Sequence, residues 1–186
     1  MIVKVLFLGC LALFAATPAA RADVVVAGKS DIGFTIKQMG VKFDGRFRKW
    51  TADVVFTPKS LASSKAVVDI DLGSVDLASD DSEAAAKGPL WFDTAKFPAA
   101  HFASTSIRDA GNDRYEVAGK LTLKGITRDC VVPITVTADP SGNRLAQGSF
   151  SIRRLDYRIG EGEWADTATV DNDIVVRVQM TLAPSP

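Results

Sequence analysis

Apolar and polar residues alternate along most of the chain. In the segment GKLTLKGITRDCVVPITV, residues 119–136, Leu121 and Leu123 alternate with Lys120, Thr122 and Lys124. A two-residue period is typical of a strand with one face in a core and the other in water. The break at Lys124-Gly125 predicts a hairpin turn, with the leucines facing inward and the lysines facing water.

The same pattern recurs in further short segments separated by turn residues such as Met39-Gly40 and Asp139–Asn143. Because proline has no N–H to donate, Pro133 predicts an edge strand or a bulge at its position. About nine short strands with hairpin spacing predict an all-β, antiparallel sandwich or barrel. The strand-like segments are 32–36, 41–47, 54–56, 66–72, 101–107, 114–123, 128–136, 145–152 and 174–182.

One segment, residues 79–89, has the pattern of a helix. Asp80 is the expected N-cap, Glu83 follows three residues later, and Gly88-Pro89 ends the run. A helix of about two turns is too short to be stable alone. We therefore expect it to dock on the sheet, anchored by Leu90-Trp91-Phe92.

The N-terminal residues 1–22 have the features of an export signal. Lys4 precedes a long apolar run, and Ala20-Arg21-Ala22 is the small-x-small pattern that predicts cleavage after Ala22. The apolar run is shorter than the roughly 20 residues that cross a bilayer, so we expect no transmembrane span. These features predict a periplasmic protein with a single domain over residues 23–186.

Charge and cysteine content narrow the class of partner. The chain has 22 Lys and Arg and 22 Asp and Glu residues, so no basic face for nucleic acid is expected. Cleavage after Ala22 would leave Cys130 as the only cysteine, which excludes an internal disulfide. We interpret Cys130 as a small buried hydrophobe, because Val132 and Ile134 continue its face.

Residues that carry catalytic or metal chemistry are scarce. The chain has no Gly-x-Ser-x-Gly elbow, and its only histidine, His101, lies in a strand-like run. One histidine and one cysteine do not make a dedicated zinc site. Asp69 and Asp71 fit the wet side of a strand. We therefore expect neither an enzyme nor a cofactor.

Aromatic residues are plentiful, with ten Phe, three Trp and two Tyr. A packed core explains most of them. A closed sheet of about eight strands, however, has an interior that either fills with side chains or holds one elongated apolar ligand. The sequence leaves both outcomes open.

A series of short motifs runs along residues 23–182. In order, they are Ser30–Phe34, Met39-Gly40, Gly45–Phe47, Ser74–Asp76, Trp91–Asp93, Phe97-Pro98, Phe102–Ser106, Gly119–Thr127, Phe150–Arg154 and Trp164. This order resembles the YceI-like family of exported bacterial proteins. The resemblance implies an antiparallel lipocalin-like barrel of about eight strands with one short helix. It also implies a long apolar ligand, such as a polyisoprenoid or a fatty-acid-like amphiphile.

We therefore expect a periplasmic carrier that holds such a ligand inside its barrel. One alternative is an enzyme on a lipid-like substrate that uses His101 or the Glu161/Glu163 loop. Another is a partner-binding protein of stress or redox systems; a homodimer is possible. From the alternation, the expected ligand contacts are Phe34, Ile36, Phe47, Val68, Ile70, Trp91, Phe92, Phe102, Leu121, Phe150 and Trp164.

Overall fold

The computed structural model describes residues 23–184. The expected export signal, residues 1–22, lies outside the described residues. Within them, no helix is long and apolar enough to cross a membrane.

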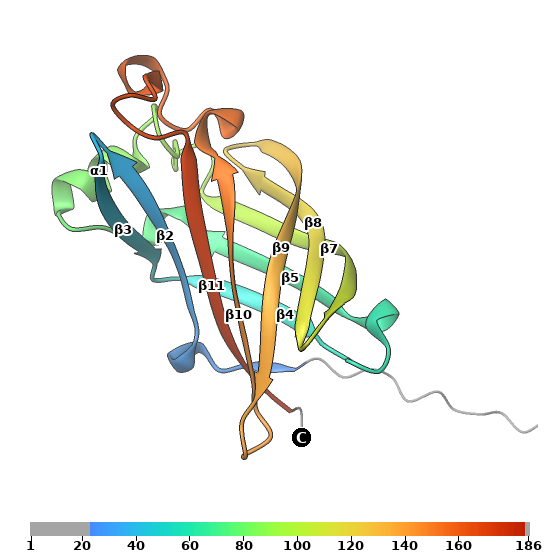
Figure 1. Cartoon of the computed structure of the whole chain (residues 1–186). Coiled ribbons are helices and arrows are strands. Elements are labelled where there is room, and N and C mark those ends of the chain that lie inside the picture. The colour runs from blue at the N-terminus through green and yellow to red at the C-terminus, as the bar shows by residue number, and fades with distance from the viewer. Residues whose placement is uncertain (1–22, 185–186) are drawn as a thin grey trace, which may run out of the picture.

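The described chain forms one eleven-stranded antiparallel sheet with a single α-helix (Figure 1). Five 3-10 turns connect the strands: η1 (Ala27–Lys29), η2 (Leu61–Ser63), η3 (Leu72–Ser74), η4 (Arg154–Tyr157) and η5 (Gly162–Ala165). The strands are β1 (Val24–Val25), β2 (Asp31–Gln38), β3 (Val41–Phe47), β4 (Trp50–Val55), β5 (Lys65–Asp71), β6 (Val75–Asp76), β7 (Ala99–Gly111), β8 (Arg114–Leu123), β9 (Ile126–Ala138), β10 (Arg144–Arg153) and β11 (Asp173–Ala183).

The sheet curls because the two ends of its strand order are joined along the chain. The order runs β4-β5-β7-β8-β9-β10-β11-β2-β3-β6, and β1 pairs with β11. The Arg48 N–H donates to the Ser74 carbonyl at 3.0 Å and the Asp71 N–H to the Lys49 carbonyl at 3.0 Å, where β3 turns into β4 and β5 into β6. The Asp23 N–H donates to the Val54 carbonyl at 2.8 Å, which links the start of the described chain to β4. The sheet is therefore a curled half-barrel.

The predicted all-β antiparallel class is confirmed. The sheet has eleven strands, whereas the prediction was about eight. Nine strands have six residues or more, and β1 and β6 have two residues each. A strand of two residues leaves no alternation to detect. The turn at Arg48-Lys49 also divides one long arm into β3 and β4.

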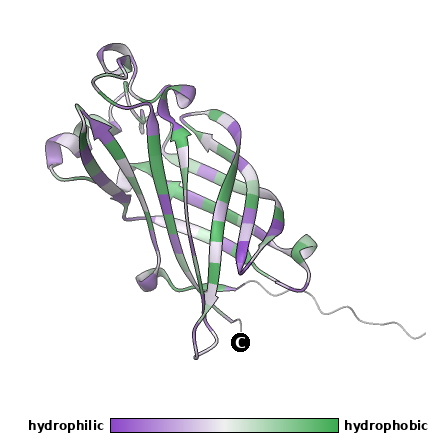
Figure 2. Ribbon diagram, viewed as in Figure 1, coloured by the Kyte–Doolittle hydropathy of each residue, from purple (hydrophilic) through white to green (hydrophobic). Residues whose placement is uncertain are grey.

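Alternation along the strands sorts apolar from polar residues, as Figure 2 shows. Leu121 and Leu123 are buried inside, whereas Lys120 lies outside and pairs with Asp129 at 2.8 Å. The prediction that Lys124 faces water is wrong. Lys124 has φ 49° in the β8–β9 turn, so its side chain leaves the strand alternation, and only 7% of the residue is exposed.

β9 lies between β8 and β10 in the strand order, so the strand as a whole is not at an edge of the sheet. Pro133 itself pairs with Glu116 on β8 and has no partner on β10, so the predicted edge holds locally. The pairing of β9 with β10 ends at Ile134, the residue after Pro133, while pairing with β8 continues past it. Cys130 is half-buried on the inner side of β9, and burial raises the pKa of its thiol. This placement fits the interpretation of Cys130 as a small hydrophobe.

The helix α1 (Asp80–Lys87) confirms the predicted helix, but its N-cap is Ser79 and not Asp80. The Ser79 hydroxyl accepts from the Ser82 N–H at 3.2 Å. Glu83 does not close a capping box; its carboxylate accepts from Arg48 at 3.2 Å and from the Leu77 N–H at 3.3 Å. The helix therefore starts one residue earlier than the pattern predicts, and Glu83 makes these contacts in place of a capping contact.

Candidate ligand cavity

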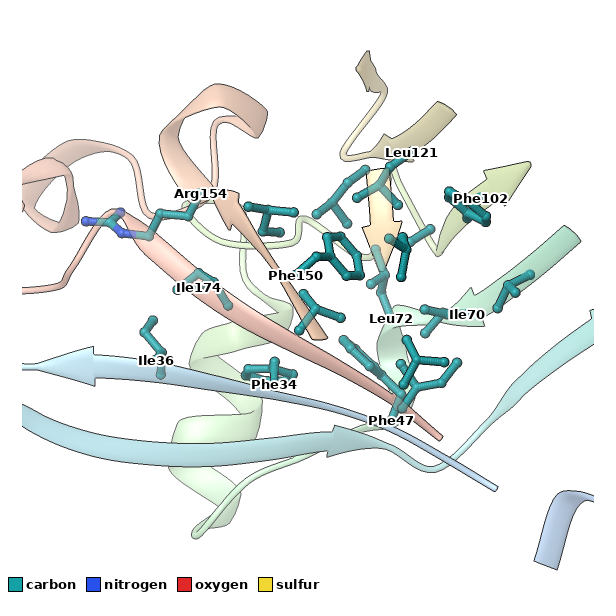
Figure 3. A pocket seen from close by; sticks show the side chains of 18 of the residues that line it. Phe34, Ile36, Phe47, Ile70, Leu72, Phe102, Leu121, Phe150, Arg154 and Ile174 are labelled. Carbon is teal, nitrogen blue, oxygen red and sulfur yellow. The ribbon is translucent and has the colours of Figure 1, made fainter. Parts of the chain in front are cut away.

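The curled sheet encloses a cavity of about 740 Å³. This volume lies in the range of pockets that hold small organic ligands, roughly 300–1,000 Å³. Most of the wall is aliphatic and aromatic side chains from the inner faces of the strands, with further residues from α1 and the loops (Figure 3). The interior is hollow and not filled by side chains.

The eleven expected ligand contacts all lie in the wall of this cavity; that they touch a ligand stays a prediction. Several of their rings pack against one another at tilted angles: the ring centroids of Phe34 and Phe47 are 5.5 Å apart, and those of Phe47 and Phe92 are 6.0 Å apart. Trp91 and Trp164 lie 5.8 Å apart. Figure 3 shows Phe34, Phe47, Phe102 and Phe150 converging from different strands.

The wall also contains residues that the expected set omitted. Ile174, Val176 and Met180 on β11 line the cavity, and their alternation could have placed them there. Ala85 and Ala86 of α1 and Arg154 after β10 also line it. No local pattern places these three, because their position depends on how the helix and the loops fold over the sheet.

Gly45 leaves room for an aromatic ring in the wall. A Cβ atom built on Gly45 would lie 2.8 Å from Leu77 Cδ2 and would overlap the Phe34 ring. Phe34 and Gly45 are cross-strand partners on β2 and β3. The absence of a side chain at position 45 therefore lets the Phe34 ring lie against the backbone of β3.

Arg154 is fully buried beside the cavity, with 0% exposure. Its Nε donates to the Asp171 carbonyl at 3.0 Å, and Nη1 donates to the carbonyls of Ile159 and Gly160 at 3.0 Å. Nη2 donates to the carbonyls of Trp164 and Val170, each at 2.7 Å. A guanidinium has five N–H groups, so every donor of Arg154 is bonded to a backbone carbonyl and none is free for a ligand.

Lys124 is the second buried cation. Its Nζ donates to the carbonyls of Pro89 and Arg158 at 3.0 and 2.7 Å and to Glu161 at 3.1 Å. Hydrogen bonds from Lys124 and Arg158 hold the pKa of the Glu161 carboxyl below its usual range. Lys124 thus ties the β8–β9 turn to the loop after η4.

The exposed residues of the cavity wall lie in only two segments. Lys42, Phe43 and Asp44 belong to β3, and the others lie between Ala78 and Ala85, before and within α1. Here β3 has no second strand partner, because β6 pairs only with Arg46 and Phe47. The cavity therefore opens between β3 and α1.

The groups of the enzyme alternative lie away from this interior. His101 is on the outer face of β7, where Nδ1 lies 2.7 Å from Asp69 Oδ1, and the two side chains are 47% and 54% exposed. Glu161 is held by Lys124 and Arg158, and Glu163 is exposed. Among residues 23–184, no cluster of three or more metal-ligating side chains occurs.

A curled antiparallel sheet around an apolar cavity defines the class of barrel-like proteins with an internal pocket. Residues 24–182 match the model of the YceI-like domain, and the chain belongs to this family. A UPF0312 protein of Vibrio parahaemolyticus is 34% identical over 166 residues, which cover 82% of this chain and 85% of the relative.

Solved structures share the fold. Burkholderia cenocepacia BcnA superimposes with a TM-score of 0.82 and 34% identity, covering 85% of this chain and 99% of that chain. The structure of a polyisoprenoid binding domain from Saccharophagus degradans, implicated in plant cell wall breakdown, has a TM-score of 0.68 at 18% identity. The match covers 89% of this chain and 99% of that chain. The Campylobacter jejuni YceI protein has a TM-score of 0.68 at 21% identity, and the match covers 76% of this chain and 85% of that chain.

Proposed function

We propose that this protein binds and carries a long apolar molecule, a polyisoprenoid or a fatty amphiphile, inside its cavity. The apolar cavity of about 740 Å³ carries the proposal. Burial of a hydrocarbon tail contributes about 0.8 kcal/mol per CH₂, so ten methylenes contribute about 8 kcal/mol before the costs of ordering. The neighbouring Saccharophagus degradans domain, described as polyisoprenoid binding, supports this ligand class.

The polar head group of such a ligand lies at the entrance of the cavity. The donors of Arg154, the one fully buried charged residue in the described wall, are all bound to carbonyls. Polar wall residues, among them Lys42, Asp44 and Ser82, are exposed where the cavity opens. A tail-first orientation therefore leaves the head group in water or close to it.

The protein acts as a binding protein and not as an enzyme. This part of the proposal is supported by the placement of His101 on the outer face and by the pairing of Glu161 with two cations. The site of action is the periplasm, reached through the export signal at residues 1–22, with cleavage after Ala22. Cell fractionation with a mass measurement of the recovered protein tests the location and the cleavage site.

Native mass spectrometry of protein purified without detergent tests the ligand. We expect a bound long-chain lipid, or uptake of an offered isoprenoid alcohol by empty protein. Protein that is repeatedly empty and takes up none of the offered lipids would overturn the proposal.

A pair of matched variants tests whether the ligand lies in the cavity. Ala146→Phe fills the cavity at a position in its wall, whereas Ala103→Phe adds the same volume outside that wall. Loss of room for about two methylenes, worth about 1.6 kcal/mol, should weaken isoprenoid binding about fifteenfold in Ala146→Phe. Equal affinity of the two variants would place the ligand elsewhere.

A further inference from the structure

The β2–β3 hairpin ends in large apolar side chains that are largely exposed to water. Met39 is 78% exposed, Val41 57% and Phe43 41%. We call these three the tip residues. Single exposed apolar residues are common, whereas three within five positions of one hairpin form a patch, which is typical of an interaction site.

The tip residues are continuous with the cavity. Val41, Phe43, Gly45 and Phe47 occupy alternate positions of β3 and so share its inner face. Phe43 pairs across the strands with Ile36, and both line the cavity. An apolar track therefore runs from water at Val41, past Phe43, to the interior at Phe47.

The outer face of the same hairpin is cationic. Lys37 and Lys42 are direct cross-strand partners, and like charges at such positions destabilise a sheet. Lys37 lies 3.7 Å from Asp171, and Lys42 has no carboxylate within 4 Å among residues 23–184. Asp44 on this face is bound to Arg177 at 3.1 Å. An anionic surface would relieve the repulsion between the two lysines.

The turn of the hairpin is hydrogen-bonded to the segment Thr169–Asp171, so the tip has a fixed position. The Met39 N–H donates to the Thr169 carbonyl at 2.8 Å, and the Asp171 N–H donates to the Lys37 carbonyl at 2.9 Å. The turn places Met39 at φ 49°, a backbone region that favours glycine or asparagine over methionine. Turn geometry thus gives no reason for a methionine at this position.

We propose that the hairpin docks on the surface of a lipid bilayer that contains anionic lipids. The tip residues enter the interface between head groups and acyl chains, and Lys37 and Lys42 face the phosphates. The ligand then moves between the bilayer and the cavity along Val41 and Phe43 without crossing water. On the other side of the entrance Asp81, at the start of α1, is exposed in the cavity wall and would be repelled by anionic lipids. This inference rests on the proposed function.

Vesicle co-sedimentation tests the docking. The mature protein, with residues 1–22 shown to be absent by mass, is mixed with vesicles of phosphatidylcholine and phosphatidylglycerol. Met39→Ser/Val41→Ser should lower the bound fraction about tenfold through loss of buried apolar area. The control Val24→Ser/Val131→Ser removes side chains that are 50% and 52% exposed elsewhere on the sheet and should change binding less than about twofold. Equal loss in both variants, or no binding by the unaltered protein, overturns the proposal.

Ligand transfer separates this inference from the proposed function. Neither Met39 nor Val41 lines the cavity, so the unaltered protein and Met39→Ser/Val41→Ser should bind a short isoprenoid alcohol in water equally. Tryptophan fluorescence measures this binding, because Trp91 and Trp164 line the cavity and Trp50 does not. Uptake of a long fluorescent isoprenoid from vesicles should be about tenfold slower in the tip variant. Equal transfer rates would refute docking alone, whereas failure of the unaltered protein to bind the short alcohol would refute the proposed function.

Discussion

Two regions beside the cavity differ in whether their side chains have partners within the protein. The braced segment, Arg154–Asn172, is held by the buried cations Arg154 and Lys124, which donate to seven backbone carbonyls and to Glu161. The rim, which comprises Gln38–Asp44 and Ala78–Ala85, exposes Met39, Val41 and Phe43. Both regions contribute residues to the cavity wall.

The contrast shows that a charge beside a cavity does not by itself make a ligand site. The guanidinium of Arg154 has no donor left, so it holds the shape of the braced segment and offers no hydrogen bond to a ligand. The rim has exposed apolar area and Lys42, which has no carboxylate within 4 Å among the described residues. Interactions with other molecules are therefore expected at the rim.

The largest effect should come from removing the brace at Arg154. Arg154→Met removes the guanidinium donors of five carbonyls, three in buried and two in partly buried hydrogen bonds. Because an unsatisfied buried polar group costs about 1–3 kcal/mol, the free energy of unfolding should fall by at least about 4 kcal/mol in urea denaturation. Arg153→Met, at the exposed neighbouring position, should change it by less than about 0.5 kcal/mol. Similar values for the two variants would contradict the role of the brace.

A smaller effect is expected at the wall below the rim. Gly45→Ala places a Cβ atom 2.8 Å from Leu77 Cδ2 and in the Phe34 ring, so the protein should lose about 1–3 kcal/mol of stability and bind isoprenoid more weakly. A Cβ atom at Gly28 meets nothing within 4 Å, which makes Gly28→Ala the control. Chemical denaturation and ligand titration of both variants measure the difference; unchanged affinity in Gly45→Ala would show that Phe34 does not shape the binding space.

The ion pair of the braced segment predicts a pH dependence. Hydrogen bonds from Lys124 and Arg158 lower the pKa of Glu161 below 4.5. A lowered folded-state pKa stabilises the protein above the unfolded-state value, and this stabilisation is lost as pH falls through the folded-state pKa. The stability difference between the unaltered protein and Glu161→Gln should therefore shrink as the pH falls from about 5 to about 2.

Glu163→Gln is the control for this titration, because Glu163 is exposed and has no cation within 4 Å among the described residues. Urea denaturation across the pH range measures both variants. A constant difference for Glu161→Gln would contradict the pairing.

The smallest effect concerns the tyrosines. Burial raises the pKa of Tyr157, in the braced segment, to about 12, and burial also raises the pKa of Tyr115 above 10.0. The chain has only these two tyrosines, so Tyr115→Phe isolates Tyr157 in an absorbance titration. We expect its phenol to ionise near pH 12. Ionisation near pH 10 in the folded protein would show that the braced segment admits water.

Local patterns in the sequence were sufficient for the sheet and for much of the cavity wall. Alternation around Leu121 and along β5 depends only on the two-residue period of a strand with one buried face. Eight of the eleven expected contacts lie on strands and follow this pattern, whereas Trp91, Phe92 and Trp164 reach the wall from turns outside the sheet. The same pattern misplaced Lys124, because a residue with positive φ in a turn no longer follows the alternation of its strand.

The sequence by itself determined the antiparallel sheet, the single helix and the inward faces of the strands, because these depend on spacing between near neighbours. The tertiary structure alone decided that the interior is hollow, that all donors of Arg154 bond to the backbone of the segment that follows it, and where the cavity opens. Those features depend on contacts between residues far apart in the chain, such as Phe34 with Gly45 and Leu77 or Lys124 with Glu161. No local period encodes such contacts.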